Sequence, residues 1–241
     1  MRMTARSVVL SVLLGAHPAW ATAAELLRLT ADFGIKETAL RVALTRMVAT
    51  GDLIRSEDGY RLSGRLLARQ RRQDDALSPP TRRWDGNWVT AVVTAVGADA
   101  RSRAALRTAL ADNRLGELRE GLWLRPDNLE VSLPTQAARR VRIMHTRDDA
   151  PAELAGLVWD LPGWAATARR LLREMSRADG VPARFAIAAA MVRHLLADPV
   201  LPAELLPGDW PGDDLRSSYA DFAALMTARR DSDSANRMEL R

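Results

Sequence analysis

The sequence predicts an α+β protein with an N-terminal winged helix-turn-helix, a middle ferredoxin-like domain and a helical C-terminal domain. Three observations support this prediction: positive charge concentrated in the first third, a helix-turn-helix-hairpin pattern in the same region, and strand patterns that later give way to helical ones. A chain of 241 residues is long enough for two or three domains. The expected parts are a DNA-binding domain (1–72), a linker (73–80), a ferredoxin-like domain (81–150) and a helical domain (151–241).

The positive charge is unevenly distributed. Residues 1–72 contain twelve Arg or Lys and six Asp or Glu, whereas the rest of the chain contains 23 basic and 24 acidic residues. The formal net charge of +5 therefore originates in the first third. A local positive field is what a module that binds polyanions needs, because neutralising phosphates releases counterions. A solvated basic surface is the alternative explanation.

The N-terminus fits two interpretations. Arg2 and Arg6 precede the apolar run Val8–Leu14, and small residues follow at 19–23, which resembles a secretory signal. The apolar residues also fall at helical spacing and stop at Gly15, as expected for the first helix of a folded domain. We favour the helix, because the next segment needs it to complete a core. No run approaches 18 apolar residues, so we expect no membrane span.

A helix-turn-helix follows. The segment Thr22–Thr30 reads as a short helix with Thr22 as its N-cap, Gly34 lies in a tight turn, and a second helix spans about Lys36–Thr50. This second helix is amphipathic. Its apolar face contains Leu40, Ala43, Leu44, Met47 and Val48. The opposite face carries the residues expected to contact DNA, namely Lys36, Thr38, Arg41, Val42, Thr45 and Arg46.

This polar face predicts reading of the major groove. An arginine can bind guanine through two hydrogen bonds, a role that suits Arg41. Thr45 is expected to contact a thymine methyl group or a phosphate. Two short strands around Asp58-Gly59 then predict a hairpin that forms the wing. Arg55, Arg61 and Arg65 would lie near the DNA backbone or the minor groove, with solvated charges as the alternative.

A basic helix is expected from Gly64 to Arg72, and the remaining sequence then changes from strands to helices. The expected order is strand, helix, strand, strand and strand, which fits a ferredoxin-like unit. These elements are Trp88–Val96, Arg101–Asp112, two strands within Leu115–Leu124 around Gly121, and Val141–Thr146. Four helices are expected afterwards: Leu154–Trp159, Trp164–Arg177, Pro182–Leu196 and Leu215–Arg230. Prolines between Pro199 and Pro211 break the region between the last two helices.

Several motifs resemble those of the PaaX family of transcriptional repressors, along nearly the whole chain. They are Gly34-Ile35 with Arg41–Met47, Trp84–Trp88, Gly121–Leu129 and Asp198–Gly212, in that order. The resemblance implies a winged helix, a ferredoxin-like middle domain and a helical C-terminal domain. It also implies a cytoplasmic homodimer that binds palindromic operators in double-stranded DNA. The family's repressors are released by a small-molecule effector, an aryl-acyl-CoA such as phenylacetyl-CoA.

The effector site is less clearly marked than the DNA site. The family usually has a His-x-Tyr-Arg stretch upstream of the Asp-Pro motif, and only Arg193 corresponds to it here. An effector outside the phenylacetate pathway therefore stays an alternative. Apolar pockets among aromatic residues are the default ligand sites, although most buried tryptophans belong to cores. An apolar pocket among Trp159, Trp164, Phe185 and Trp210 is one expectation for the ligand site, and the candidate effector residues are Trp159, Trp164, Arg193 and Trp210.

Catalysis and metal binding receive little support. The chain has no cysteine and only three scattered histidines, so neither a thiol nucleophile nor a metal cluster is indicated. No nucleophile elbow, P-loop or dinucleotide motif is present, and we expect neither an enzyme nor a cofactor. Two alternatives stay open. One is a metal-dependent nuclease that uses Asp99 after the first strand of the middle domain, and the other is an architectural DNA-binding protein without an effector.

Overall fold

The computed structural model describes residues 3–95 and 99–238, the last eight of these by their backbone alone. The chain forms two compact units. The first consists of Met1–Leu77, Arg170–Leu196 and Asp214–Arg241, and the second of Ser78–Arg169 and Ala197–Asp213. Residues 151–241, expected as one helical domain, thus contribute to both units. Helices and small antiparallel sheets occur together, which confirms the α+β class.

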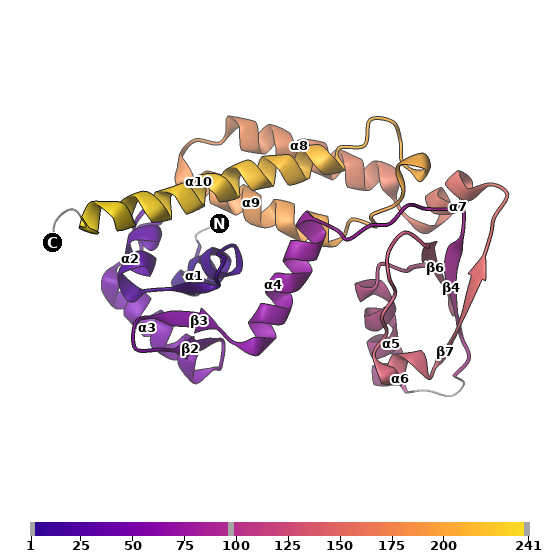
Figure 1. Cartoon of the computed structure of the whole chain (residues 1–241), viewed down its shortest axis with the longest axis horizontal. Coiled ribbons are helices and arrows are strands. Elements are labelled where there is room, and N and C mark those ends of the chain that lie inside the picture. The colour runs from indigo at the N-terminus through magenta and orange to yellow at the C-terminus, as the bar shows by residue number, and fades with distance from the viewer. Residues whose placement is uncertain (1–2, 96–98, 239–241) are drawn as a thin grey trace. The chain divides into compact units, whose positions relative to one another are not determined.

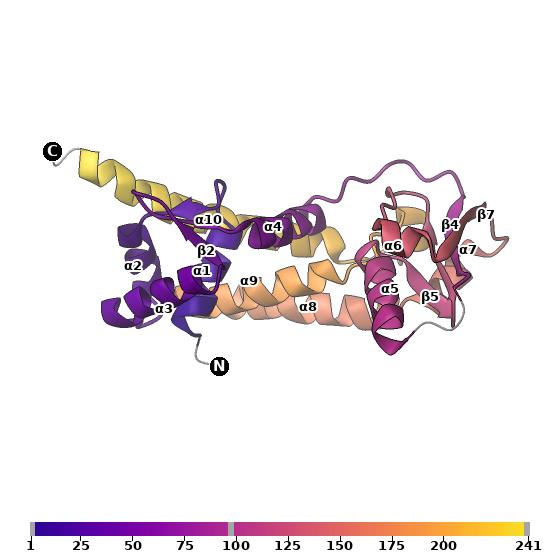
Figure 2. The same ribbon diagram turned by 90° about the horizontal axis from the view of Figure 1, so that it is seen from below.

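The first unit begins with the predicted helices and hairpin (Figures 1 and 2). Its N-terminal elements are α1 (Ala5–Leu14), β1 (Trp20–Ala21), α2 (Ala23–Ala31), α3 (Glu37–Ala49), β2 (Leu53–Arg55), β3 (Tyr60–Leu62) and α4 (Gly64–Leu77). Thr22 caps α2 as predicted: its hydroxyl accepts from the Glu25 amide, and the Glu25 carboxylate accepts from the Thr22 amide. Gly34 has a φ of +65°, so it supplies the left-handed turn between α2 and α3.

Helix α1 belongs to the core, as the helical interpretation of the N-terminus required. Val9 and Leu13 are fully buried and pack with Leu26 of α2 and with Leu40 and Leu44 of α3. Figure 2 shows these three helices grouped beside the hairpin. The apolar face predicted for α3 therefore faces inward, and its polar face stays outside.

The hairpin gains a third strand that the sequence did not predict. β1 pairs with β3, so the strand order is β1-β3-β2. Two residues are too few for a strand pattern, which explains why β1 was missed. A Cβ atom on Gly59 would lie 2.5 Å from the Ala21 carbonyl oxygen, so only glycine allows the turn to approach β1 this closely.

Helix α4 continues beyond the expected start of the linker. It runs to Leu77, whereas the sequence placed its end near residue 72. Burial explains the longer helix: Gln70 and Ala76 are buried, and α4 packs against α9 (Gly180–Leu196). The Gln70 amide donates to the carbonyl oxygens of Leu13, Leu14 and Ala16, which satisfies the C-terminal end of α1. The domain boundaries themselves stay a prediction.

The second unit contains a four-stranded antiparallel sheet in the order β5-β6-β4-β7. Its elements are β4 (Trp88–Val93), α5 (Ala100–Asp112), β5 (Gly116–Arg119), β6 (Leu122–Pro126), α6 (Thr135–Ala138), β7 (Val141–Thr146) and α7 (Pro151–Val158). The four expected strands are present, and the short α6 was not predicted. β4 ends at Val93, three residues before the predicted end, and Val96 lies outside the described residues. The order β-α-β-β-α-β is the one that a ferredoxin-like unit has.

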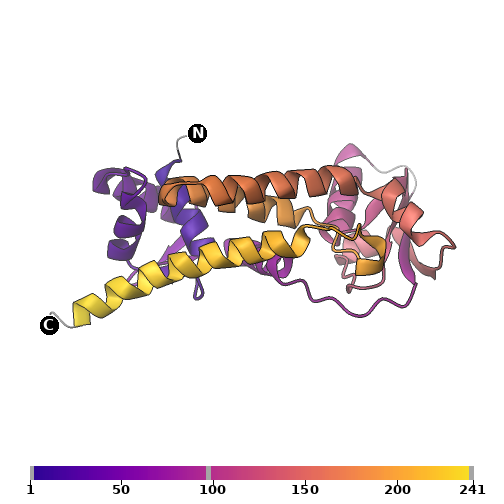
Figure 3. The same ribbon diagram turned by 90° about the horizontal axis from the view of Figure 1, so that it is seen from above.

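Different side chains cover the two faces of this sheet. On one face, Ala91 and Trp123 pack against Leu106 and Leu110 of α5, and α5 and α6 lie on this side in Figure 1. On the other face, Trp88 and Leu124 pack with α7 and with the start of α8 (Leu161–Arg177). The loop that follows α9 contains a 3-10 turn, η1 (Ala203–Leu205), and belongs to this second core. The last described element is α10 (Gly212–Met238), the yellow helix of Figure 3.

A buried arginine joins two of the sequence motifs within the second unit. Arg125 is 1% exposed, and its guanidinium donates to the Pro126 and Asn113 carbonyl oxygens and to Asn128 Oδ1, at 3.0, 3.2 and 2.8 Å. Asn128 Nδ2 in turn donates to the Val200 carbonyl oxygen at 2.9 Å. The Asp198 carboxylate accepts from the Val200 amide. The Gly121–Leu129 and Asp198–Gly212 motifs therefore form one structural network.

Candidate DNA interface

The polar face of α3 is exposed along its whole length. All six residues predicted to contact DNA on this helix and at its N-cap are exposed: Lys36, Thr38, Arg41, Val42, Thr45 and Arg46. Buried Leu40, Leu44 and Met47 fix the opposite face against the core, so the helix cannot rotate without losing that packing. Val42 is 50% exposed, which leaves an apolar group available for a thymine methyl contact. The face thus combines cationic, hydroxyl and apolar groups.

An intrahelical ion pair holds Arg41. Its Nε and Nη2 atoms donate to Glu37 Oε1 at 2.8 and 2.6 Å, one turn earlier in the helix. Both side chains are more than half exposed, so the pair contributes little to stability. Thr45 donates its hydroxyl hydrogen to the Arg41 carbonyl oxygen at 3.0 Å, and its methyl group is then the part free to contact a base. To bind a guanine, Arg41 must break its ion pair with Glu37 or contact both groups at once.

The two wing arginines lie on opposite faces of the hairpin. Ile54 pairs with Arg61, and Arg55 pairs with Tyr60. Paired residues in antiparallel strands point to the same face, and neighbours along a strand alternate. Arg55 and Arg61 are both exposed but therefore point in opposite directions. The sequence placed both near DNA, and a single face of the wing presents only one of them.

Sequence reasoning missed a cluster around Asp52, just before the wing. Arg6 of α1 donates to Asp52 Oδ2 at 2.8 Å, and Arg65 of α4 donates to Asp52 Oδ1 at 2.5 Å. The Asp52 side chain is 3% exposed. Arg65 was expected near the DNA backbone, and the structure shows it bound to a carboxylate. No local pattern predicts this cluster, because its arginines lie 46 and 13 residues away from Asp52.

We expect Asp52→Asn to destabilise the first unit by about 1 to 3 kcal/mol at pH 7, because charged hydrogen bonds to a buried carboxylate are lost. The hydrogen bond from Arg6 holds the pKa of Asp52 below its ordinary value of 3.8. A lowered pKa contributes stability above that ordinary value, and the contribution disappears as the pH falls through the lower folded pKa. The difference in free energy of unfolding between Asp52→Asn and wild type, measured with urea, should therefore become smaller below pH 3.8.

Asp58→Asn is the matched control for this measurement, since Asp58 is exposed in the wing turn. It should change the free energy of unfolding by less than about 0.5 kcal/mol. Equal unfolding midpoints for the two variants at pH 7 would contradict a structural role for the Asp52 cluster.

Three of the four candidate effector residues pack against other side chains in the second unit. The rings of Trp164 and Trp210 stack with centroids 4.5 Å apart, and Trp159 stacks on Trp88 at 6.4 Å. All three belong to or contact the core of that unit. The fourth residue, Arg193 of α9, lies in the first unit and lines a small pocket of about 80 Å³. The four residues therefore do not form one site within either unit.

The residue expected for the nuclease alternative caps a helix. Asp99 accepts hydrogen bonds from the Ser102 amide and hydroxyl at 2.9 and 2.8 Å, at the N-terminus of α5. The bond from the Ser102 amide lowers the pKa of Asp99 most. Among the described residues, no three His, Cys, Asp or Glu side chains are grouped as metal ligands. Within the same residues, no helix combines the length and apolarity needed to cross a membrane.

Comparison with known proteins agrees with the resemblance seen in the sequence. Residues 4–66 match the PaaX-like protein family, residues 81–152 match the PaaX protein central Cas2-like domain, and residues 161–233 match the PaaX-like protein C-terminal domain. No curated protein matches the chain. A solved structure, the uncharacterized protein Rv0674 from Mycobacterium tuberculosis, is 67% identical with a TM-score of 0.87, and the match covers 95% of this chain and 98% of that one. The chain belongs to the PaaX family.

Proposed function

We propose that this protein is a sequence-specific DNA-binding transcriptional regulator that acts as a repressor and is released by a small-molecule effector. The observation that carries the proposal is the exposed face of α3, with Arg41, Thr45 and Arg46 directed outward and a hairpin directly after the helix. A helix with such a face, supported by a wing, fits the major groove. Membership of a family of regulators supports the same function.

The proposed partner is a palindromic operator in double-stranded DNA, bound by a homodimer. Two copies of α3 would then enter half-sites about one helical turn apart, roughly 34 Å. The positive charge of residues 1–72 supports attraction to the phosphate backbone. The proposed target is an operon for the breakdown of an aromatic acid or for a secondary metabolite, and an aryl-acyl-CoA is the effector class that the family suggests.

Footprinting with the full-length protein tests the proposal. The DNA should come from the regions upstream of the protein's own gene and its neighbours, with a shuffled fragment as control. We expect a protected site with two-fold symmetry, and an affinity that falls by about 10³ to 10⁵ between 50 and 200 mM salt if six to ten phosphates are contacted. Equal affinity for the operator regions and the shuffled fragment would contradict sequence-specific regulation.

A further inference from the structure

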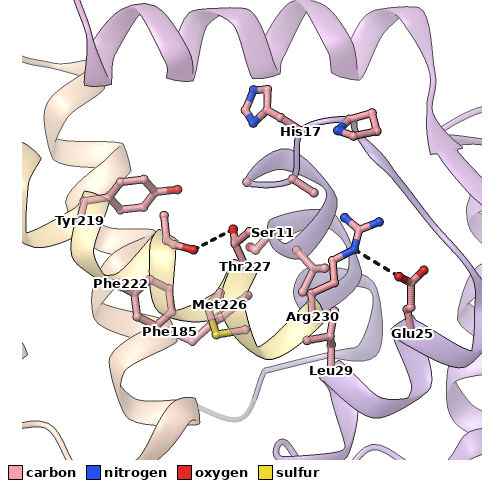
Figure 4. Close-up of a pocket in the computed structure, with 15 residues that line it drawn as sticks. Ser11, His17, Glu25, Leu29, Phe185, Tyr219, Phe222, Met226, Thr227 and Arg230 are labelled. Atoms are coloured by element: carbon pink, nitrogen blue, oxygen red, sulfur yellow. Dashed lines mark hydrogen bonds and ion pairs between the residues drawn. The ribbon is translucent and has the colours of Figure 1, made fainter. Parts of the chain in front are cut away.

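The first unit contains a pocket of about 310 Å³ between α1, α2, α9 and α10, shown in Figure 4. This volume lies at the lower end of the range of about 300 to 1,000 Å³ that small-molecule sites have. Apolar side chains make up much of its wall: Val12, Leu29, Phe185, Phe222, Ala223 and Met226. The Phe185 and Phe222 rings meet edge to face at 6.1 Å, which gives the pocket an aromatic side.

The polar groups of the pocket include one ion pair. Arg230 Nε lies 3.3 Å from Glu25 Oε1, and Arg230 Nη2 donates to the Trp20 carbonyl oxygen at 2.7 Å. Figure 4 shows this pair at one side of the pocket and Tyr219 at the other. Both charged side chains are less than one fifth exposed. The guanidinium and the carboxylate balance each other, so a buried ionic ligand would add an uncompensated charge at high cost.

Hydroxyl groups provide the remaining polar contacts. Ser11 and Thr227 line the pocket together with Tyr219. Burial raises the pKa of Tyr219, with a smaller contribution from the nearby Asp74, so its hydroxyl stays protonated at neutral pH. The other titratable side chain of the lining is His17, whose Nε2 lies 3.2 Å from Asp74. These groups suit a ligand that carries a hydroxyl or amide group.

We propose that this pocket binds an uncharged aromatic molecule that carries a hydroxyl or amide group, and that this molecule, rather than an aryl-acyl-CoA, controls DNA binding. The second part rests on the function proposed above. The site lies in the first unit and contains Phe185, whereas the three tryptophans that the sequence grouped with Phe185 lie in the second unit. Arg193 lines the adjoining pocket of about 80 Å³, which shares Phe185, Tyr219 and Phe222 with this one.

Two ion pairs connect the pocket to the DNA-reading module. The Glu25 carboxylate forms an ion pair with Arg230, and it also accepts a hydrogen bond from the Thr22 amide in the N-terminal cap of α2. Arg229 pairs with Asp32 at the other end of α2, at 2.9 Å. Helix α10 therefore contacts both ends of the helix that precedes α3. A ligand that displaces α10 from α1 and α2 shifts the helix-turn-helix, and ligand and DNA then affect each other's affinity reciprocally.

Calorimetry with 4-ethylphenol tests the site on the full-length protein without DNA. We expect saturable binding, at least tenfold weaker binding to Ala223→Phe, and unchanged binding to Ala224→Phe. Ala223 lines the pocket, whereas its neighbour Ala224 is exposed on the same helix and outside the lining. The anion 4-ethylbenzoate should bind at least tenfold more weakly than 4-ethylphenol, because the pocket charges are already balanced.

Methyl NMR of methionine provides a readout that does not depend on how a variant folds. The Met226 signal, assigned with Met226→Leu, should shift with 4-ethylphenol, whereas Met144 in the second unit should not. Absence of saturable binding, or binding with no Met226 shift, would overturn the site. Both measurements omit DNA, so a negative result would contradict the ligand site without contradicting the proposed DNA-binding function. If the ligand binds at this site but operator affinity does not change, the site stands and only the proposed control of DNA binding is overturned.

Discussion

Replacing Arg125 by methionine is expected to lower the free energy of unfolding of the second unit by about 3 to 5 kcal/mol, because three acceptors lose a charged donor at a cost of about 1 to 3 kcal/mol each. The variant leaves the Asn113 and Pro126 carbonyl oxygens and Asn128 Oδ1 without their donor. Desolvation by burial lowers the pKa of Arg125 to about 10, so the side chain is still charged at neutral pH. Methionine keeps much of the volume, so the loss should reflect the hydrogen bonds.

Tryptophan fluorescence during urea unfolding measures this effect, because six of the seven tryptophans lie in the second unit and only Trp20 lies in the first. Arg119→Met is the control, since Arg119 is exposed on β5. It should change the free energy of unfolding by less than about 0.5 kcal/mol. A similarly small change for Arg125→Met would show that the network does not stabilise the fold.

Arg41→Ala is expected to weaken operator binding by about 5- to 150-fold, because a bidentate contact to guanine contributes about 1 to 3 kcal/mol of discrimination. Affinity for random DNA should fall much less, so the ratio between operator and random DNA should decrease. Arg41 is exposed and contacts only the neighbouring turn of α3, so the fold should tolerate the change. Fluorescence anisotropy with labelled operator and random duplexes gives both affinities.

Arg61→Ala is the matched comparison on the wing. It should weaken binding to operator and to random DNA by similar factors. The slope of log affinity against log salt concentration should fall by about the value for one phosphate contact. The reverse pattern, with Arg61→Ala changing sequence preference and Arg41→Ala lowering all affinities equally, would mean that the wing reads the bases. Circular dichroism of both variants verifies that the helices are intact.

The sequence predicted the elements better than the contacts between them. Helices such as α2 and α3 were predictable because their caps, turn and apolar spacing are local, with Thr22 and Gly34 as clear signals. The two-residue β1 was not, because it is defined only by pairing with β3. α4 was predicted too short, since its packing partner α9 lies more than 100 residues later in the chain.

In the candidate site, too, local features could be predicted and contacts between distant segments could not. The exposed face of α3 follows from helical periodicity, so all its residues were predicted correctly as exposed. The Asp52 cluster and the pocket lined by Phe185 and Phe222 arise from segments far apart in the chain, so the sequence indicated only a single member, Phe185, and grouped it with tryptophans of the second unit. Three tryptophans were proposed for the effector on aromaticity alone, and stacking against other rings explains them equally well.

The ion pair between Glu37 and Arg41 has a consequence for how salt affects operator binding. Arg41 already has a carboxylate as its counterion before any DNA arrives. When Arg41 turns toward the operator, the Glu37 carboxylate loses its partner and takes up a cation from solution, which offsets one of the cations released from the DNA. A salt titration should then undercount the cationic side chains that touch DNA by about one per subunit. Glu37→Gln removes this carboxylate, so the slope of log affinity against log salt concentration should become steeper.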